Sequence, residues 1–344
     1  MAGIDFEIVL LGPESYLEWN RFVDESPQGD VFCYSWWLDV VTHSRFKIYV
    51  AVEKERIVAG MPLAYDKFGK INEPYLTRTL GILYKLQETT SYYKRISNQR
   101  RWAEGLIEVI PFGDFVQTCT HHNFNDWLPY RWKGFCQTSR YTYLLNLNNR
   151  NPDDLKKGLK VNCKNAINKA ERNNIRVEES QNAEELYNLV LQSYRRQGIK
   201  FRIPYVEFKA LDEVIMQNGK RLIMIARDSS GNYHAGTYIA YNNRSAYFLL
   251  SGSNPDLRNL GGHTLAVWES MKFLTGKVTC FNFGGSDIRN IEDHFRGFGG
   301  DLTPYFHIFN ERQLHCIDVR FHARSLFDHS IDILEAFRLR FFSY

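Results

Sequence analysis

Alternating apolar and polar positions predict two similar hairpins, one in each half of the chain. Residues 46–65 (FKIYVAVEKERIVAGMPLAY) and residues 220–241 (KRLIMIARDSSGNYHAGTYIAY) each combine an apolar strand, a polar turn and a second apolar strand. An amphipathic helix precedes each hairpin, because apolar residues recur at helical spacing. In the first half these residues are Tyr16, Trp19 and Val23, and in the second Leu186, Leu189, Val190 and Tyr194. The repeated helix and hairpin predict a duplicated α/β domain.

A strong helix start lies between the two copies. Asn151 is a favourable N-cap, Pro152 suits the first helical position, and two aspartates follow in the first turn. Apolar residues then continue as one stripe over 155–170, which predicts a single helix. We place the domain boundary just before it, which gives an N-terminal domain of residues 1–145 and a C-terminal domain of residues 146–344.

The second half continues with a strand, a glycine loop, a helix and another strand. The strands are predicted at 245–252 and 278–283, and the helix begins at about residue 263, directly after Gly261 and Gly262. Glycines at a helix start give up a side-chain cap, but they let an anion approach the free N–H groups. A phosphate site and a simple change of chain direction therefore both explain the Gly-Gly pair.

Composition narrows the class of protein. At 344 residues and 44% hydrophobic, the chain is long enough for two domains with their own cores, and a net charge of +4 lacks the basic excess of a dedicated nucleic-acid binder. Six widely spaced cysteines without a C-x-x-C pair suggest neither a zinc site nor a redox dithiol, so we expect no metal. The N-terminus resembles no signal peptide and no 18-residue apolar run occurs, so we expect a cytoplasmic protein without a membrane span.

The segment RNLGGH, residues 258–263, resembles the acyl-CoA pyrophosphate loop of GNAT acyltransferases, whose pattern is Q/R-x-x-G-x-G/A. Arg258 and Gly261 match the pattern, whereas His263 occupies the last small-residue position. Together with the duplication, the segments HNFNDWLPYRWKGFCQTSRYTYLLNL and FNFGGSDIRNIEDHFRGFGGDLTPYF make most of the chain similar to the tandem-GNAT, FemAB-like superfamily. The resemblance implies an α/β fold of two tandem GNAT-like domains, each a mixed central sheet flanked by helices.

Two activities are implied by this superfamily: transfer of an amino acid from aminoacyl-tRNA to a peptidoglycan precursor, and transfer of an acyl group from acyl-CoA to an amino sugar. Fem-type ligases often carry a coiled-coil insertion, and no sustained heptad run occurs here, which favours the acyl-CoA branch. The chain is similar to nucleotide-linked amino-sugar N-acyltransferases of O-antigen or capsule synthesis. The first domain would then shape the acceptor site and the second would bind acyl-CoA. A catalytically silent carbohydrate-binding module remains the alternative outside the enzyme class.

The candidate site residues follow from these expectations. Acyl-CoA is expected to contact Arg258, Gly261, Gly262, His263, Thr264 and Ser286. The acid and base candidates are His263, Asp287, His122 and Tyr305, the last because a tyrosine protonates the leaving thiolate in many GNAT enzymes. Aromatic residues that could stack on the sugar or the nucleobase are Trp36, Trp127, Tyr130 and Trp132. Helix capping for Asp287, core packing for Tyr305 and scaffold packing for the aromatics are the competing interpretations.

Overall fold

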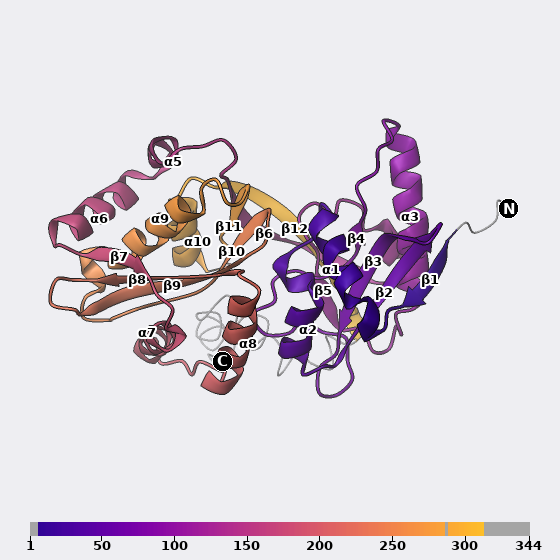
Figure 1. The fold of residues 1–344 in the computed structure, drawn as a ribbon, viewed down its shortest axis with the longest axis horizontal. Helices are drawn as coiled ribbons and strands as arrows, with labels where there is room; N and C mark the ends of the chain where they lie inside the picture. Colours follow the sequence, from indigo (N-terminus) through magenta and orange to yellow (C-terminus); the bar gives the residue numbers. More distant parts are fainter. Residues whose placement is uncertain (1–5, 286–287, 313–344) are drawn as a thin grey trace, which may run out of the picture. The chain divides into compact units, whose positions relative to one another are not determined.

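The computed structural model describes residues 6–285 and 288–312, and the chain divides into two compact units (Figure 1). Among the described residues, the first unit contains 6–140 and 304–312, and the second contains 141–285 and 288–303. Strand β6 (Cys136–Asn146) carries the chain from the first unit into the second, and β12 (Asp301–Phe309) carries it back. The last described segment therefore belongs to the first unit, although it follows the second in sequence.

The first unit is built around the antiparallel sheet β1-β2-β3-β4. Its strands are β1 (Glu7–Leu10), β2 (Phe46–Glu53), β3 (Arg56–Ala64), β4 (Leu83–Tyr84) and, separately, β5 (Gln117–Cys119), which pairs with the end of β12. Its helices are α1 (Tyr16–Glu25), α2 (Ser35–Thr42), α3 (Tyr92–Glu108) and α4 (Leu128–Trp132), with 3-10 turns at Pro13–Ser15 and Val31–Cys33. The hairpin predicted for residues 46–65 is thus confirmed as β2 and β3.

One core of the first unit forms between β3 and the C-terminal half of α3. Trp102, Leu106 and Ile107 of α3 pack with Met61 and Leu63 of β3. With Ala103 they form two pairs four positions apart, 102/106 and 103/107, so they share one helix face. The N-terminal turns of α3 contribute no residue to this core.

The second unit holds the sheet β6-β11-β10-β9-β8-β7. Its strands are β7 (Arg176–Glu179), β8 (Arg221–Arg227), β9 (Tyr233–Tyr241), β10 (Ser245–Ser253) and β11 (Cys280–Asn282). Its helices are α5 (Pro152–Gly158), α6 (Val161–Arg172), α7 (Ala183–Arg196), α8 (Tyr205–Gln217), α9 (Gly262–Leu274) and α10 (Arg289–Arg296), with a 3-10 turn at Arg258–Leu260. The second predicted hairpin, at residues 220–241, is confirmed as β8 and β9.

Helices cover both faces of this sheet, with α6 and α9 on one face and α7 on the other (Figure 1). The residues Ile167 of α6 and Val267 and Met271 of α9 pack with Leu222 of β8 in one continuous core. Of the neighbouring strand pairs named here, β10 and β11 run parallel and the other four run antiparallel. The second unit is therefore a mixed sheet flanked by helices, as predicted.

The prediction of one continuous helix over residues 155–170 was wrong. Asn151 caps α5 as expected, because its Oδ1 accepts the N–H of Asp154 at 2.9 Å. However, Leu159 and Lys160 adopt extended backbone angles, and the Lys160 N–H bonds the carbonyl of Gly297 at 2.8 Å. A tertiary hydrogen bond thus replaces the helical one, and the chain forms two helices with a corner between them.

Candidate functional site

The parallel strands β10 and β11 of the second unit separate after a short contact. Among the described residues they pair at Ser245–Tyr247 of β10, opposite Cys280–Asn282. β11 then ends, whereas β10 continues for six residues to Ser253. Within the described part of the chain, no strand pairs with residues 250–253 on that side, and these residues are the open edge of β10. A register shift against β9 between Phe248 and Leu250 further deforms this half of β10.

Helix α9 begins with a glycine pair that tertiary packing requires. Gly261 has φ +85°, and a Cβ atom there would lie 2.2 Å from the carbonyl oxygen of Ala166 on α6. A Cβ atom on Gly262 would lie 2.7 Å from the Cβ of His234 on β9. Both missing side chains would point into protein atoms, so close packing of α9 against α6 and β9 is the physical reason for these glycines.

The first turn of α9 keeps its N–H groups uncapped by any side chain of the described residues. They belong to Gly262, His263 and Thr264. In the first turn of an α-helix these groups have no carbonyl acceptor inside the helix itself. Arg258 lies in the 3-10 turn that leads into the helix, and its side chain is exposed. An uncapped helix start carries positive potential, and the guanidinium adds a full positive charge nearby in sequence. This combination can receive an anion.

His263 connects the start of α9 to the open edge of β10. Its Nε2 lies 3.0 Å from the Ser251 hydroxyl, and its ring centroid lies 5.1 Å from that of His294 on α10. Burial, reinforced by the neighbouring His294, lowers the pKa of His263 to about 3, and burial lowers the pKa of His294 to about 4. Both imidazoles are therefore neutral at cellular pH, and the Nε2 of His294 is buried without a hydrogen-bond partner among the described residues.

The first unit holds the other acid and base candidates. The rings of His122 and His121 lie 3.9 Å apart, and the Nε2 of His121 faces the buried carboxylate of Asp30 at 3.7 Å. Burial, followed by the effect of His121, lowers the pKa of His122 to about 3. Burial raises the pKa of Tyr305 on β12, so its hydroxyl stays protonated and can act only as an acid.

The four predicted stacking residues also lie in the first unit, in different environments. Tyr130 is fully buried in the core, which favours packing over contact with a ligand. Trp36 stacks on Tyr34 at 5.1 Å, and Trp127 packs partly buried against the same core as Tyr130. Trp132 is 58% exposed. Of the four, Trp132 alone presents most of its ring to solvent.

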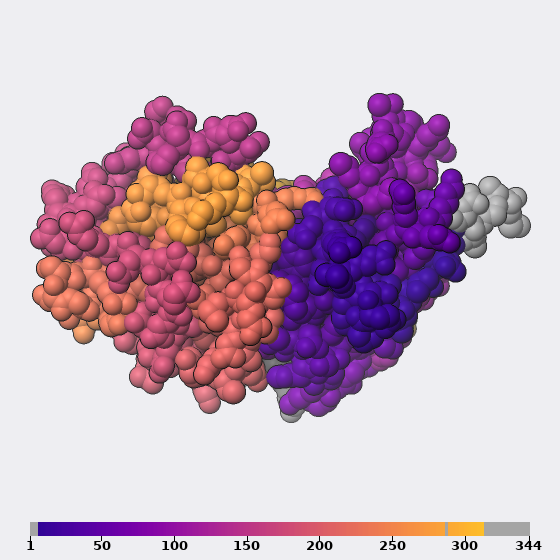
Figure 2. Space-filling view, viewed as in Figure 1, coloured from indigo at the N-terminus to yellow at the C-terminus, as the bar shows by residue number. Residues whose placement is uncertain are grey.

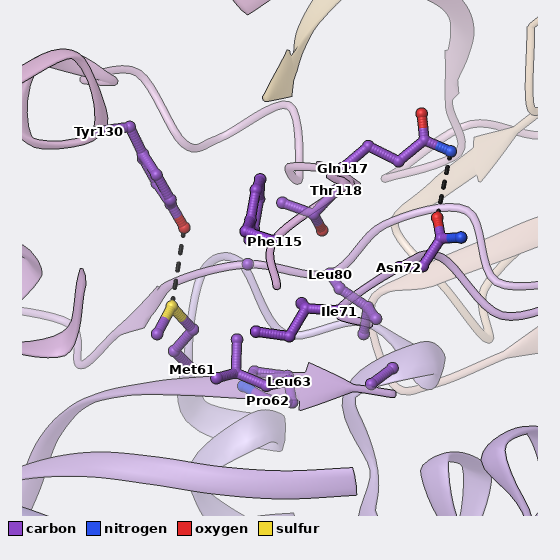
Figure 3. A pocket seen from close by; sticks show the side chains of 12 residues that line it. Met61, Pro62, Leu63, Ile71, Asn72, Leu80, Phe115, Gln117, Thr118 and Tyr130 are labelled. Atoms are coloured by element: carbon purple, nitrogen blue, oxygen red, sulfur yellow. Dashed lines mark hydrogen bonds between the residues drawn. The ribbon is translucent and has the colours of Figure 1, made fainter. Parts of the chain in front are cut away.

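A pocket with about 280 Å³ of space between its atoms, part of it open to solvent, lies beside this core (Figure 3). Its wall is mostly apolar, with Tyr130 bonded to the Sδ of Met61 at one end. At the other end Gln117 accepts from the Nε2 of His307 at 2.8 Å and donates to Asn72 at 3.3 Å. The pocket thus pairs an apolar wall with a buried chain of polar groups.

The structure brings one set of predicted residues together in the second unit: Arg258, Gly261, Gly262, His263 and Thr264. Ser286 and Asp287 lie outside the described residues. Sequence reasoning missed Ser251 and His294. Ser251 belongs to an ordinary strand pattern, and His294 lies between charged residues that suggested surface, so neither gave a local signal.

Comparison with known proteins places the second unit in a recognised fold. Residues 158–296 match the model of the family described as an acetyltransferase (GNAT) domain. No curated protein matches the chain in a sequence comparison. No group of three or more His, Cys, Asp or Glu side chains suited to a metal ion occurs among the described residues, and no helix in that part is long and apolar enough to cross a membrane.

Solved structures extend the likeness to both units. The structure titled FemX is 12% identical and superposes with a TM-score of 0.64, covering 91% of this chain and 100% of that one. A tandem GNAT protein from the clavulanic acid biosynthesis pathway is 12% identical and superposes with a TM-score of 0.50, covering 88% of this chain and 98% of that one. The C-terminal domain of a putative lysylphosphatidylglycerol synthetase from Agrobacterium fabrum is 12% identical and superposes with a TM-score of 0.53, covering 89% of this chain and 95% of that one. The predicted fold, two tandem GNAT-like domains, is confirmed.

Proposed function

Because its second unit has a GNAT-type acyltransferase fold, we propose that the chain transfers an acyl group from acyl-CoA to the amine of a nucleotide-activated amino sugar. The observation that carries this proposal is the uncapped start of α9 beside the open edge of β10. Such sugars are precursors of surface polysaccharides such as O-antigen or capsule, and dTDP-3-amino-3,6-dideoxyhexose is one acceptor of this class. The cytoplasm is the proposed location.

The pyrophosphate of CoA would occupy the start of α9. Its oxygens would accept from the free N–H groups of Gly262, His263 and Thr264, and the Arg258 guanidinium would add a charge-assisted bond. Ser286, which follows β11 in sequence, is proposed to join this contact. The helix start supplies fixed donors, so anion binding there requires little reorganisation of the protein.

The thioester would lie along the open edge of β10. Attack of the amine nitrogen on the carbonyl carbon creates an oxyanion, which backbone N–H groups of this edge would stabilise before the carbon–sulfur bond breaks. Ser251 is a further donor when the Nε2–H of His263 donates to its hydroxyl oxygen, because the Ser251 hydroxyl proton is then free for the oxyanion. The attacking amine has a pKa of roughly 8, so a fair fraction is neutral at cellular pH and a weak base is sufficient.

The proton transfers are assigned by charge state. His263 and His122 are neutral and can accept a proton only transiently, because burial opposes the imidazolium form. Tyr305 keeps its proton and suits the acid that protonates the departing thiolate. Asp287 remains a candidate base. We propose that the first unit shapes the acceptor site, with Trp36, Trp127, Tyr130 and Trp132 as candidate sugar or base contacts.

An aminoacyl-tRNA donor is the second candidate function, and one observation favours it. His263 occupies the position where the acyl-CoA loop pattern has a small residue, and its Nε2 lies 3.0 Å from the Ser251 hydroxyl on β10. The likeness to the structure titled FemX agrees with this alternative. The two proposals differ in the donor and share the fold and the transfer step.

Thiol release tests the donor directly. The purified chain is incubated with a panel of acyl-CoA thioesters and nucleotide-linked amino sugars, and free CoA is measured. Arg258→Gln is expected to raise the KM for acyl-CoA about five- to tenfold with little change in kcat, since it removes a ground-state contact to the phosphates. The matched control is Arg176→Gln, an exposed arginine on the edge strand β7, which should leave KM unchanged.

The alternatives give different results in the same assay. Aminoacyl-tRNA that supports transfer while no acyl-CoA releases thiol would establish the Fem-type donor. A protein that binds the sugar nucleotide but transfers nothing from either donor would be a carbohydrate-binding module. Equal KM values for the Arg258 and Arg176 variants would show that the pyrophosphate does not bind at the start of α9.

A further inference from the structure

Three large apolar side chains lie exposed within eight residues at the N-terminal end of α3. Leu86 is 72% exposed, Tyr92 69% and Tyr93 79%, although side chains of this kind are usually at least partly covered. This end of α3 and the loop before it form the purple projection at the top of the first unit (Figures 1 and 2). Residues 85–95 are called the basic aromatic tip below.

The basic aromatic tip is ordered by contacts of its own. Ser91 caps α3 by accepting the Lys94 N–H, the Gln87 amide donates to the carbonyl of Arg95 at 3.3 Å, and Asn98 donates to Gln87 at 3.1 Å. The core contacts of α3 begin only at Trp102, so the exposed side chains do not stabilise this unit. The exposed apolar surface is therefore held in place without serving the fold.

Positive charge surrounds these apolar groups. Residues 85–101 contain five basic residues against one acidic residue, Glu88, whereas the whole chain has 43 basic and 39 acidic residues. Arg100 is bound to Asp126 at 2.6 Å, and the Arg95 guanidinium lies 5.4 Å from the centre of the Tyr92 ring. The remaining basic side chains of this segment, Lys85, Lys94 and Arg101, are exposed.

We propose that the basic aromatic tip docks the protein on a membrane surface that contains anionic lipids. Tyrosine rings favour the level of the lipid headgroups, Leu86 can enter the apolar region beneath, and the surrounding Lys and Arg attract negative headgroups. Neither the apolar nor the electrostatic contribution is sufficient alone, and the tip supplies both. This role is independent of the proposed acyl transfer, which involves α9 and β10 of the second unit.

An RNA strand is the other polyanion that basic and aromatic residues bind, and the geometry disfavours it. Single-stranded RNA is usually held in a positively charged groove whose aromatic rings stack on successive bases. Here the aromatic groups lie on a projecting tip, and Leu86 can neither stack on a base nor form a hydrogen bond. A projecting apolar tip inserts into a membrane surface more readily than it wraps a nucleic-acid strand.

Co-sedimentation of the full chain with lipid vesicles tests this role. Vesicles of phosphatidylethanolamine with about one third phosphatidylglycerol should bind the protein at low salt, and vesicles of phosphatidylcholine alone should bind it at least about tenfold less. The triple variant L86S/Y92S/Y93S should lower the partition coefficient at least about tenfold. The charge variant K94Q/R95Q should lower the partition coefficient by a similar factor. Added salt should likewise lower the partition coefficient of the unaltered protein.

The matched control is Phe68→Ser. Phe68 is 71% exposed on the same unit and has Lys67 beside its ring at 5.1 Å, so it presents the same chemistry elsewhere. The control should change binding less than about twofold, and thermal unfolding should be unchanged in every variant because all substituted side chains are exposed. Binding that is equal for both vesicle types, or insensitive to the triple variant, or equally weakened by Phe68→Ser, overturns the proposal. Binding to an unstructured RNA that depends on the tip, without vesicle binding, overturns it as well.

Discussion

Replacing Gly261 by alanine tests why a glycine begins α9. Alanine would have to keep φ near +85°, which costs roughly 1–2 kcal/mol for an L-residue. Its Cβ would also lie 2.2 Å from the carbonyl oxygen of Ala166, a backbone atom that cannot rotate away. Moving α9 away from α6 to relieve this overlap should cost a further 1–3 kcal/mol or so, as overpacking does in cores. The expected loss in the free energy of unfolding is about 2–5 kcal/mol.

The matched control is Gly276→Ala. Gly276 has φ +79°, and a Cβ there would meet no atom within 4 Å, so this variant suffers only the backbone cost of roughly 1–2 kcal/mol. Urea unfolding of both variants, followed by circular dichroism, measures the difference between them. If Gly261→Ala and Gly276→Ala lose the same stability within about 0.5 kcal/mol, the contact with α6 is not the reason for the glycine.

Three further outcomes are expected. Asp212→Ala should cost about 3–5 kcal/mol in chemical unfolding, because the buried Arg221 loses the carboxylate 2.8 Å away and keeps only the neutral Gln181 as a partner. The exposed Glu213→Ala should change stability by less than about 0.5 kcal/mol. Asn151→Ala should cost about 1 kcal/mol and speed amide exchange in α5, and unchanged exchange would contradict the capping role. Stability should be full above pH 6.5 and decline as pH falls toward about 3, because four partly or fully buried imidazoles have native pKa values of about 3 to 4, below the unfolded value near 6.5. The unfolded chain therefore binds more protons in that window. The four residues are His122, His263, His294 and His307. Urea unfolding from pH 4 to pH 8 measures the effect, and a free energy of unfolding that stays constant over this range would contradict it.

Local patterns were sufficient for the hairpins and for the start of the linker helix. Alternation over 46–65 and 220–241 repeats along one strand, so it needs no partner to be recognised. The cap at Asn151 acts within its own first turn. The corner between α5 and α6 depends instead on the carbonyl of Gly297, more than a hundred residues away, and no local pattern indicates it.

The candidate site shows the same division. The sequence marked Arg258, Gly261 and His263 through their spacing at a helix start. It could not show that Ser251 and His294 lie beside His263, since these three residues come from a strand and two helices that only folding brings together. Nor could it show that residues 304–312 join the first unit, so the surroundings of Tyr305 could not be predicted from its neighbours in sequence.

The sequence alone thus determined the repeated α/β elements, because hydrophobic periodicity and caps act over a few residues. Only the tertiary structure determines that packing requires the Gly261-Gly262 pair and that His263 is neutral. It also determines that the basic aromatic tip exposes Tyr92 and Tyr93. Each of these depends on which distant atoms surround a residue. Close contact and burial are properties of the folded chain as a whole.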